Sequence, residues 1–193
     1  MLPRISSSKL VSTWLLVTAA ASIVAMVDGG WLASWTALRP ERIWHGQVWR
    51  LVTWIFIEPG PWNLAFTCAC IYKFGGELQP RWGDRRLRRF VLQIVIAASV
   101  VATLLALLSD LTWNMYRCGG VAVSDTLIIA WARQYPNDSI RMFGFIDLGG
   151  QRLVGFTVGI TMLIALSSSP FVMVPELVAC LAAATYPRRW LAV

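Results

Sequence analysis

The chain has 193 residues, of which 57% are hydrophobic and only 14% are charged, and its formal net charge is +7. An average soluble domain carries about 25% charged residues, so this composition excludes a protein whose whole surface is covered by water. The basic residues follow a membrane topology and form no patch typical of nucleic-acid binding. We therefore expect an integral membrane protein with no nucleic-acid partner.

Apolar runs divide the chain into six candidate membrane spans. A helix of about 17–25 predominantly apolar residues can cross a bilayer. The last two runs could be merged into one helix, but Pro170 would break it, because proline removes a helix hydrogen bond and clashes with the preceding turn. The expected spans are 12–30, 62–79, 90–108, 119–135, 153–168 and 171–186.

The distribution of charge agrees with six spans. Cytoplasmic segments of membrane proteins are enriched in lysine and arginine. With the N-terminus inside, thirteen basic and four acidic residues fall in cytoplasmic segments, whereas the outer segments hold four of each. Asp125 and Glu176 remain inside spans. We expect both termini in the cytoplasm, with short tails at 1–11 and 187–193, and one membrane domain covering 1–193.

The segment 31–61, between the first two spans, is rich in tryptophan and holds the chain's one histidine, His45. Trp44, Val48, Leu51 and Ile55 follow a helical spacing, which predicts short helices in the outer interface. A plain aromatic belt is the simpler interpretation. Arg50 favours a membrane-embedded loop, because an arginine within an apolar interfacial helix needs a protein partner or a lipid phosphate.

The four cysteines indicate neither a metal site nor a disulfide. Cys68 and Cys70 are two residues apart on a predicted helix, so their thiols point about 200° apart. We expect all four to act as small hydrophobic residues, and we expect no metal and no cofactor.

Several motifs resemble the rhomboid-like superfamily. Trp49-Arg50 with the following LVTWIFIEPGPWNL, then Gly76-Glu77-Leu78 and Trp82-Gly83-Asp84, resemble the first loop and second span of rhomboid proteases and derlins. The later stretch LIIAWARQYPNDSIRMFGFIDLGGQRL resembles the derlin pattern. The resemblance covers residues 40–190 and is closest in character to derlins and bacterial rhomboid pseudoproteases.

The resemblance implies an all-α fold: a six-transmembrane helical bundle with a membrane-embedded first loop. In the family, the Trp-Arg pair, here Trp49 and Arg50, stabilises that loop. Gly76, Glu77 and Gly83 match a motif that fixes the cytoplasmic end of the second span, although here the leucine follows the glutamate. The family also needs its first span. We therefore expect 12–30 to be retained, although Arg4 and Lys9 before an apolar run also fit a cleaved signal peptide.

The resemblance also implies that the catalytic pair of a rhomboid protease is missing. The family's serine lies in G-x-S-G on span four, and its histidine in H-x-x-G-x-x-x-G on span six. Here Ala122 takes the serine position and Glu176 the histidine position, while Gly120 matches the first glycine. Ser124 is two residues past Ala122 and points about 200° away on a helix. We expect a pseudoprotease and no enzyme.

Two roles remain open for the polar residues inside spans. Ser124, Asp125 and Glu176 could line a polar cavity at the former protease site, because intramembrane acids usually face the bundle interior. They could equally form hydrogen bonds between helices that only hold the bundle together.

The function implied is that of a derlin-like protein that binds membrane-protein clients and helps deliver them to an AAA+ membrane protease or unfoldase. The 16-residue span 153–168 would be about 24 Å long, shorter than the roughly 30 Å hydrocarbon core, and would thin the bilayer. The chain ends soon after Tyr186 without the tail by which derlins recruit their ATPase. The expected docking surfaces are therefore the loop 136–152 and an arginine block formed by Arg81, Arg85, Arg86, Arg88 and Arg89.

The alternative is a small-solute transporter or channel, with Asp125 and Glu176 as a proton or cation path. No inverted repeat supports it. The sequence leaves open the client, the ATPase and whether the chain forms a homo-oligomer. Arginine is abundant and lysine is limited to Lys9 and Lys73, which we interpret as a GC-rich bacterial source and a bacterial inner membrane.

Overall fold

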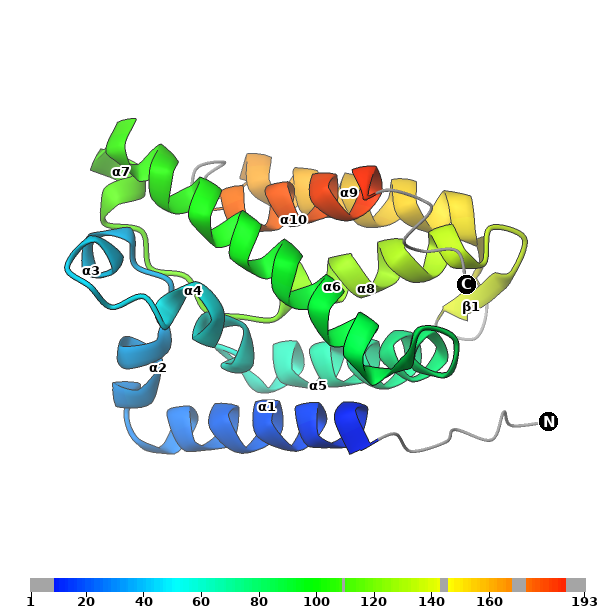
Figure 1. Cartoon of the computed structure of the whole chain (residues 1–193), viewed down its shortest axis with the longest axis horizontal. Helices are drawn as coiled ribbons and strands as arrows, with labels where there is room; N and C mark the ends of the chain where they lie inside the picture. The colour runs from blue at the N-terminus through cyan, green and yellow to red at the C-terminus, as the bar shows by residue number, and fades with distance from the viewer. Residues whose placement is uncertain (1–8, 109, 143–145, 168–172, 187–193) are drawn as a thin grey trace.

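The computed structural model describes residues 9–108, 110–142, 146–167 and 173–186. Its six longer helices are α1 (Lys9–Val27), α5 (Pro61–Cys70), α6 (Gly76–Leu105), α8 (Val121–Gln134), α9 (Gly150–Ser167) and α10 (Val174–Thr185) (Figure 1). The shorter elements are α2 (Trp31–Thr36), α3 (Pro40–Trp44), α4 (Arg50–Thr53), η1 (Trp54–Phe56), η2 (Ile71–Gly75), η3 (Ala106–Leu108), α7 (Asp110–Trp113), β1 (Ser139–Met142) and β2 (Ile146–Gly149).

Helix α8 is the central element of the bundle. It contacts α5, α6, α9 and α10, and every residue from Ala122 to Ala132 is buried. A helix that is buried on all sides is mostly apolar all round, and the polar residues Ser124, Asp125 and Thr126 of this helix are buried with the rest. Ala179 and Ala183 of α10 are also fully buried, and small residues of this kind let two helices approach closely. The predicted helical membrane bundle is confirmed.

The second and third predicted spans form one continuous element with a single break. α5, the π-turn η2 and the start of α6 run as one helix up to Trp82. Gly83 then adopts φ +72° and ψ 157°, and the helix resumes in a new direction. L-residues with a side chain rarely adopt positive φ, so this break depends on glycine. Four arginines of the predicted block therefore lie on the first turns of a helix.

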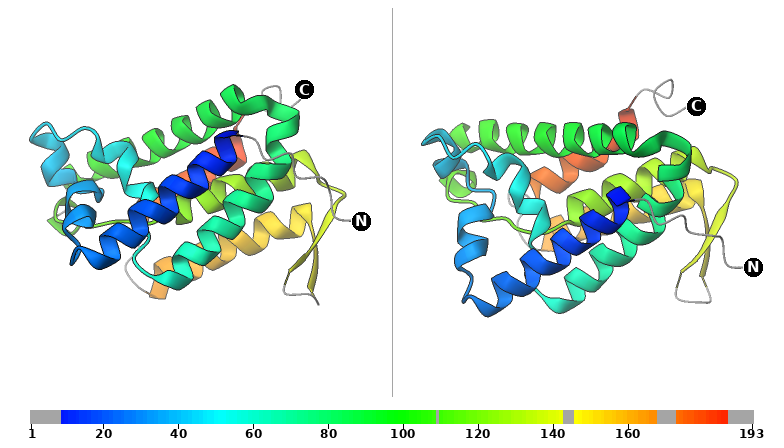
Figure 2. Two further views of the ribbon diagram at one scale, coloured as in Figure 1. Left: turned by 90° about the horizontal axis from the view of Figure 1, so that it is seen from below. Right: turned by 60° about the horizontal axis from the view of Figure 1, so that its bottom comes forward.

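The all-α prediction needs one correction. Within the predicted loop 136–152, β1 and β2 pair as an antiparallel hairpin, with Ser139 opposite Gly149 and Met142 opposite Ile146. The hairpin projects from one end of the bundle, and α2 and α3 lie at the other end (Figure 2). Ile140, Met142, Ile146 and Leu148 alternate with polar or small residues, a period-two pattern typical of strands, which the sequence interpretation missed.

The lengths of the helices revise the expected spans. α1, the element Pro61–Leu108 and α9 are long and apolar enough to cross a membrane, and α10 is a shorter apolar helix. α9 has 18 residues and begins at Gly150, so the predicted 16-residue span was too short. α5 continues into η2 and α6. Of the other longer helices, the two shortest are α8, with 14 residues, and α10, with 12. The count of six spans stays a prediction.

Both ends of the described chain lie at the same end of the bundle, which the predicted topology requires. α1 begins, and α10 ends, at the end that carries the hairpin (Figure 1). Tyr186, just after α10, packs edge-on against Phe90 and donates a hydrogen bond to Gln93 at 2.9 Å. The tails 1–8 and 187–193 lie outside the described residues, and the side of the membrane they occupy stays a prediction.

Candidate functional site

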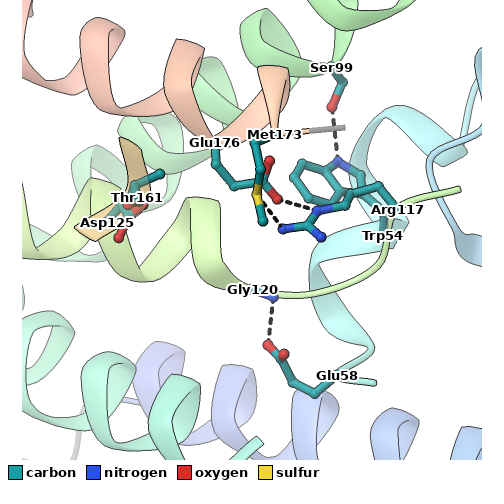
Figure 3. A network of polar contacts seen from close by, with 9 residues as sticks. All are labelled: Trp54, Glu58, Ser99, Arg117, Gly120, Asp125, Thr161, Met173 and Glu176. Carbon is teal, nitrogen blue, oxygen red and sulfur yellow. Dashed lines mark hydrogen bonds and ion pairs between the residues drawn. The ribbon is translucent and has the colours of Figure 1, made fainter. Parts of the chain in front are cut away.

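Residues 117–120, here called the pre-α8 segment, connect three parts of the bundle just before the central helix (Figure 3). Arg117 and Leu38 exchange two backbone hydrogen bonds of 2.8 and 3.1 Å. The Gly119 N–H donates to the Trp54 carbonyl at 3.1 Å. These bonds tie the first loop to the start of α8, where the resemblance places the protease site.

An ion pair joins the pre-α8 segment to α10. Arg117 Nε donates to Glu176 Oε1 at 2.5 Å, and Arg117 Nη2 contacts Met173 Sδ at 3.0 Å. Glu176 is 1% exposed and lies in the first turn of α10, where the helix macrodipole also favours a negative charge. The carboxylate of Glu176, at the predicted histidine position, is therefore paired with the guanidinium of Arg117.

Glu58 is a second buried carboxylate beside the same segment. Its Oε1 accepts a hydrogen bond of 2.6 Å from the Gly120 N–H, and its own N–H bonds to Ser22 Oγ of α1 at 3.0 Å. Burial raises the pKa of Glu58, and the hydrogen bond from Gly120 works against that rise. Glu58 thus links α1, the start of α5 and the start of α8.

Gly120 is required here by close approach. A Cβ at this position would lie 2.6 Å from Thr67 Cγ2 and 2.8 Å from Glu58 Oε1. Real Cβ contacts are not so short, and Thr67 belongs to a packed helix that has little freedom to move. The glycine that matches the family's G-x-S-G motif is explained by packing.

The predicted polar trio does not share one set of partners. Asp125 Oδ2 accepts hydrogen bonds from Thr161 Oγ1 of α9 at 2.9 Å and from Cys180 Sγ of α10 at 3.4 Å. Glu176 bonds to Arg117 instead, and the buried Ser124 Oγ has no hydrogen-bond partner among the described residues. Asp125 therefore joins three helices, and a common cavity for the three residues stays a prediction.

Arg50 has the protein partners that its position demands. Its Nη1 donates to the carbonyls of Ser34 and Ala37, both at 2.8 Å, and its Nε donates to Gln47 Oε1 at 2.7 Å. Arg50 is 3% exposed. Burial lowers the pKa of its guanidinium, and the charges of Arg39 and Arg42 lower it further. The side chain holds α2 and α4 in place.

Trp49 and Trp54, two of the five tryptophans of the first loop, have different environments. Trp49 is exposed and donates only a 3.3 Å hydrogen bond to the Trp35 carbonyl. Trp54 is fully buried, and its Nε1 donates to Ser99 Oγ of α6 at 2.9 Å, while Ser99 donates to the Leu51 carbonyl at 2.9 Å. Trp44 also reaches α6, through a 3.4 Å hydrogen bond to the Thr103 carbonyl. The sequence analysis did not single out Trp54, although it is the fully buried tryptophan that fixes the loop to α6.

Glu77 joins α6 to α8 at the hairpin end. Its Oε2 accepts a 2.5 Å hydrogen bond from Trp131 Nε1, and its Oε1 pairs with Lys73 at 2.5 Å. Trp131 in turn stacks on Tyr135, with ring centroids 5.4 Å apart. Gly76 lies in the helix beside Glu77, and Gly83 forms the break that follows.

The arginine block lies near this cluster. Arg81 is placed over the Tyr135 ring, 4.7 Å from its centroid, a cation–π contact that fixes its side chain. Arg85, Arg86, Arg88 and Arg89 are exposed, whereas Leu87 between them is fully buried. The block thus forms one basic, solvent-facing side of a helix end.

Sequence reasoning missed Glu58 and Arg117. Glu58 was interpreted only as part of a helix-breaking turn, and Arg117 only as one of four basic residues in outer segments. The available signal was charge balance, because an acid inside a span, such as Glu176, needs a cation. Among the basic residues of the predicted outer segments, Arg117 is the one nearest to the start of a span.

The comparisons with known proteins agree with this architecture. Residues 9–190 match a family described as "Eukaryotic integral membrane protein (DUF1751)". The chain therefore belongs to this eukaryotic membrane-protein family. It is also similar to Derlin-1 from rice, Oryza sativa subsp. japonica, with 30% identity over 103 residues, and to Derlin-1 from Arabidopsis thaliana, with 26% identity over 114 residues.

These matches cover 53% and 58% of the chain, and 41% of each relative. The resemblance to derlins and the rhomboid-like superfamily is confirmed. The predicted bacterial inner membrane is wrong, since the family and both relatives are eukaryotic. Arginine and lysine carry the same charge, so their ratio reports nothing about which membrane holds a chain.

Proposed function

We propose that this protein is a catalytically inactive, derlin-like member of the rhomboid-like superfamily that handles membrane-protein clients in the endoplasmic reticulum. The observation that carries the proposal is the match to a eukaryotic integral membrane family together with similarity to two plant Derlin-1 proteins. The chain is one domain of six spans, with both termini in the cytoplasm and the first loop at the lumenal face.

The geometry of the pre-α8 segment supports a role without peptide cleavage. Ala122, at the nucleophile position, is fully buried. Glu176, at the histidine position, is held by Arg117 at 2.5 Å. A general base must reach the proton that it removes, and a carboxylate paired with a guanidinium is a poor base. The catalytic pair is replaced by a structural link.

The short helices support a role in thinning the bilayer. α10 has 12 residues, which corresponds to about 18 Å, against a hydrocarbon core of roughly 30 Å. Leu181 of α10 is 65% exposed, so this short helix faces lipid as well as protein. A span shorter than the bilayer thins it, and a thinner bilayer lowers the cost of moving a client's polar residues across it.

Force for extraction comes from a partner in this account. An AAA+ unfoldase or protease docks at the exposed arginines Arg85, Arg86, Arg88 and Arg89, together with the hairpin end of the bundle. Membrane-protein clients reach the chain from the lipid phase. We do not propose transport, because Asp125 and Glu176 are each bonded to protein groups.

Client handling is tested by removing the protein from cells and following the half-lives of unstable membrane proteins after protein synthesis is stopped. The proposal predicts longer half-lives for a subset of them, and recovery of the same proteins with an AAA+ ATPase when the tagged chain is purified from membranes. Unchanged half-lives and no co-purified ATPase would overturn it. Labelling of the purified chain at a serine by a fluorophosphonate would overturn the inactive assignment separately.

A further inference from the structure

A polar pocket of about 210 Å³ lies in the first loop. It is lined by Ser34, Trp35, Arg39, Arg42, Gln47 and Arg50. Three of these six residues are arginines and none is acidic. The pocket is therefore a concentration of positive charge within a tryptophan-rich loop.

Little in the described part of the chain neutralises that charge. Arg39 makes one ion pair with Glu41, with a long N–O distance of 3.8 Å and both side chains about one-third exposed. The exposed Arg42 side chain has no hydrogen-bond or ion-pair partner among the described residues. Arg50 is fixed through its Nε and Nη1 to neutral acceptors only. Like charges held close together favour a bound anion.

The pocket lies among side chains that favour the membrane surface. Trp31, Trp35, Trp44 and Trp49 around it are 45–63% exposed, and exposed tryptophans of membrane proteins collect at the level of lipid headgroups. Guanidinium groups bind phosphate through paired N–H donors, better than an ammonium does. At that depth, phosphate is the most abundant anion available to an arginine cluster.

We propose that Arg39, Arg42 and Arg50 form a binding site for a phosphate-bearing anion, supplied by an anionic phospholipid headgroup of the lumenal leaflet. Arg50 lies at the bottom of the site and is preorganised, since its side chain is already fixed by three hydrogen bonds. Arg42 closes the site from the surface. A bound lipid would fix the orientation of the first loop against the bilayer, independently of any client.

The test measures lipid binding to the full chain by native mass spectrometry from detergent. The probes are dioleoyl phosphatidic acid, dioleoyl phosphatidylcholine and inorganic phosphate. The variant is Arg42→Gln, because that side chain has no described partner and its loss leaves the fold intact. The control is Arg86→Gln, which removes one exposed positive charge from the other end of the bundle. Unchanged melting temperatures of both variants verify folding.

We expect wild-type protein to bind phosphatidic acid more tightly than phosphatidylcholine. Arg42→Gln should weaken phosphatidic acid binding about tenfold, the effect of losing one charge-assisted hydrogen bond, and Arg42→Lys should recover part of it. Arg86→Gln should change little. Competition by inorganic phosphate at equal concentration would support the site and assign it to a soluble anion. No preference for phosphatidic acid, or equal losses in the two glutamine variants, would overturn the site.

Discussion

Arg117 and Glu176 come from distant parts of the chain, 59 residues apart, and meet at the position that the resemblance assigns to the histidine of a rhomboid protease. Glu176 is almost fully buried and Arg117 is 18% exposed. Removing one member of such a pair leaves an uncompensated charge in a low-dielectric environment, which costs more than the pair itself contributes. The pair is therefore the residue-level feature on which the bundle's geometry depends.

Arg117→Ala should lower the free energy of unfolding by about 3 kcal/mol, because Glu176 is left buried and unpaired. The double variant Arg117→Ala/Glu176→Gln should recover much of that loss, since no buried charge remains. Unfolding in mixed micelles measures both. The control is Arg39→Ala, whose exposed partner Glu41 predicts a loss below about 1 kcal/mol. Additive effects of the two substitutions at 117 and 176 would contradict the pairing.

Gly120→Ala should destabilise the protein by about 1–3 kcal/mol, the usual cost of forcing extra volume into a packed site. Its Cβ would lie against Thr67 and Glu58. Gly155→Ala in α9 is the matched control, because nothing lies within 4 Å of a Cβ there. A helical Gly→Ala change in open space should stabilise by up to about 1 kcal/mol. Shifts of the melting temperature in the same direction for both variants would count against the close approach of Thr67 and Glu58 to Gly120.

At the scale of elements, the first loop is a folded structure held by contacts among its own helices and to the bundle. Arg50 holds α2 to α4, Trp54 holds the loop to α6, and Leu38 pairs with Arg117 before α8. Several of these contacts supply hydrogen bonds to backbone groups of the loop, which have less water available in the membrane interface. The short helices α2, α3 and α4 depend on these contacts, because isolated helices of that length are unstable.

Arg50→Lys should loosen this loop without unfolding the bundle. A lysine cannot reproduce the guanidinium fork and keeps at most part of the three hydrogen bonds. We expect faster amide hydrogen exchange across residues 31–56 and unchanged exchange in α8, measured by mass spectrometry. Arg85→Lys, an exposed site on α6, should leave both regions unchanged. Equal protection of residues 31–56 in the two variants would show that Arg50 does not fix the loop.

The sequence located the longer helices well because long apolar runs indicate membrane-length helices directly. It placed Asp125 and Glu176 inside spans and required partners for Arg50. It did not identify those partners, since Thr161, Arg117 and the carbonyls of α2 meet these side chains only after folding. The hairpin was missed because a short alternating pattern over 139–149 is a weak signal beside the long apolar runs of membrane spans. The predicted start of the following helix was wrong for the same reason.

At the scale of the whole molecule, the buried helix α8 lies at the centre of the bundle. The pre-α8 segment and Asp125 form hydrogen bonds that connect it to its neighbours. In this bundle, the ion pair between Arg117 and Glu176 lies at the predicted histidine position. We therefore predict that the protein contacts its clients and does not cleave them.

In the most direct measurement, a short-lived, single-span membrane protein is reconstituted in proteoliposomes together with the purified chain. Gel electrophoresis then follows the size of this client. The chain carries a photo-crosslinking residue at position 181, on the lipid-facing side of α10. We predict a light-dependent adduct that contains the full-length client, with no shorter client band after long incubation. A client fragment that accumulates with time, and disappears when the chain is omitted, would contradict the central claim.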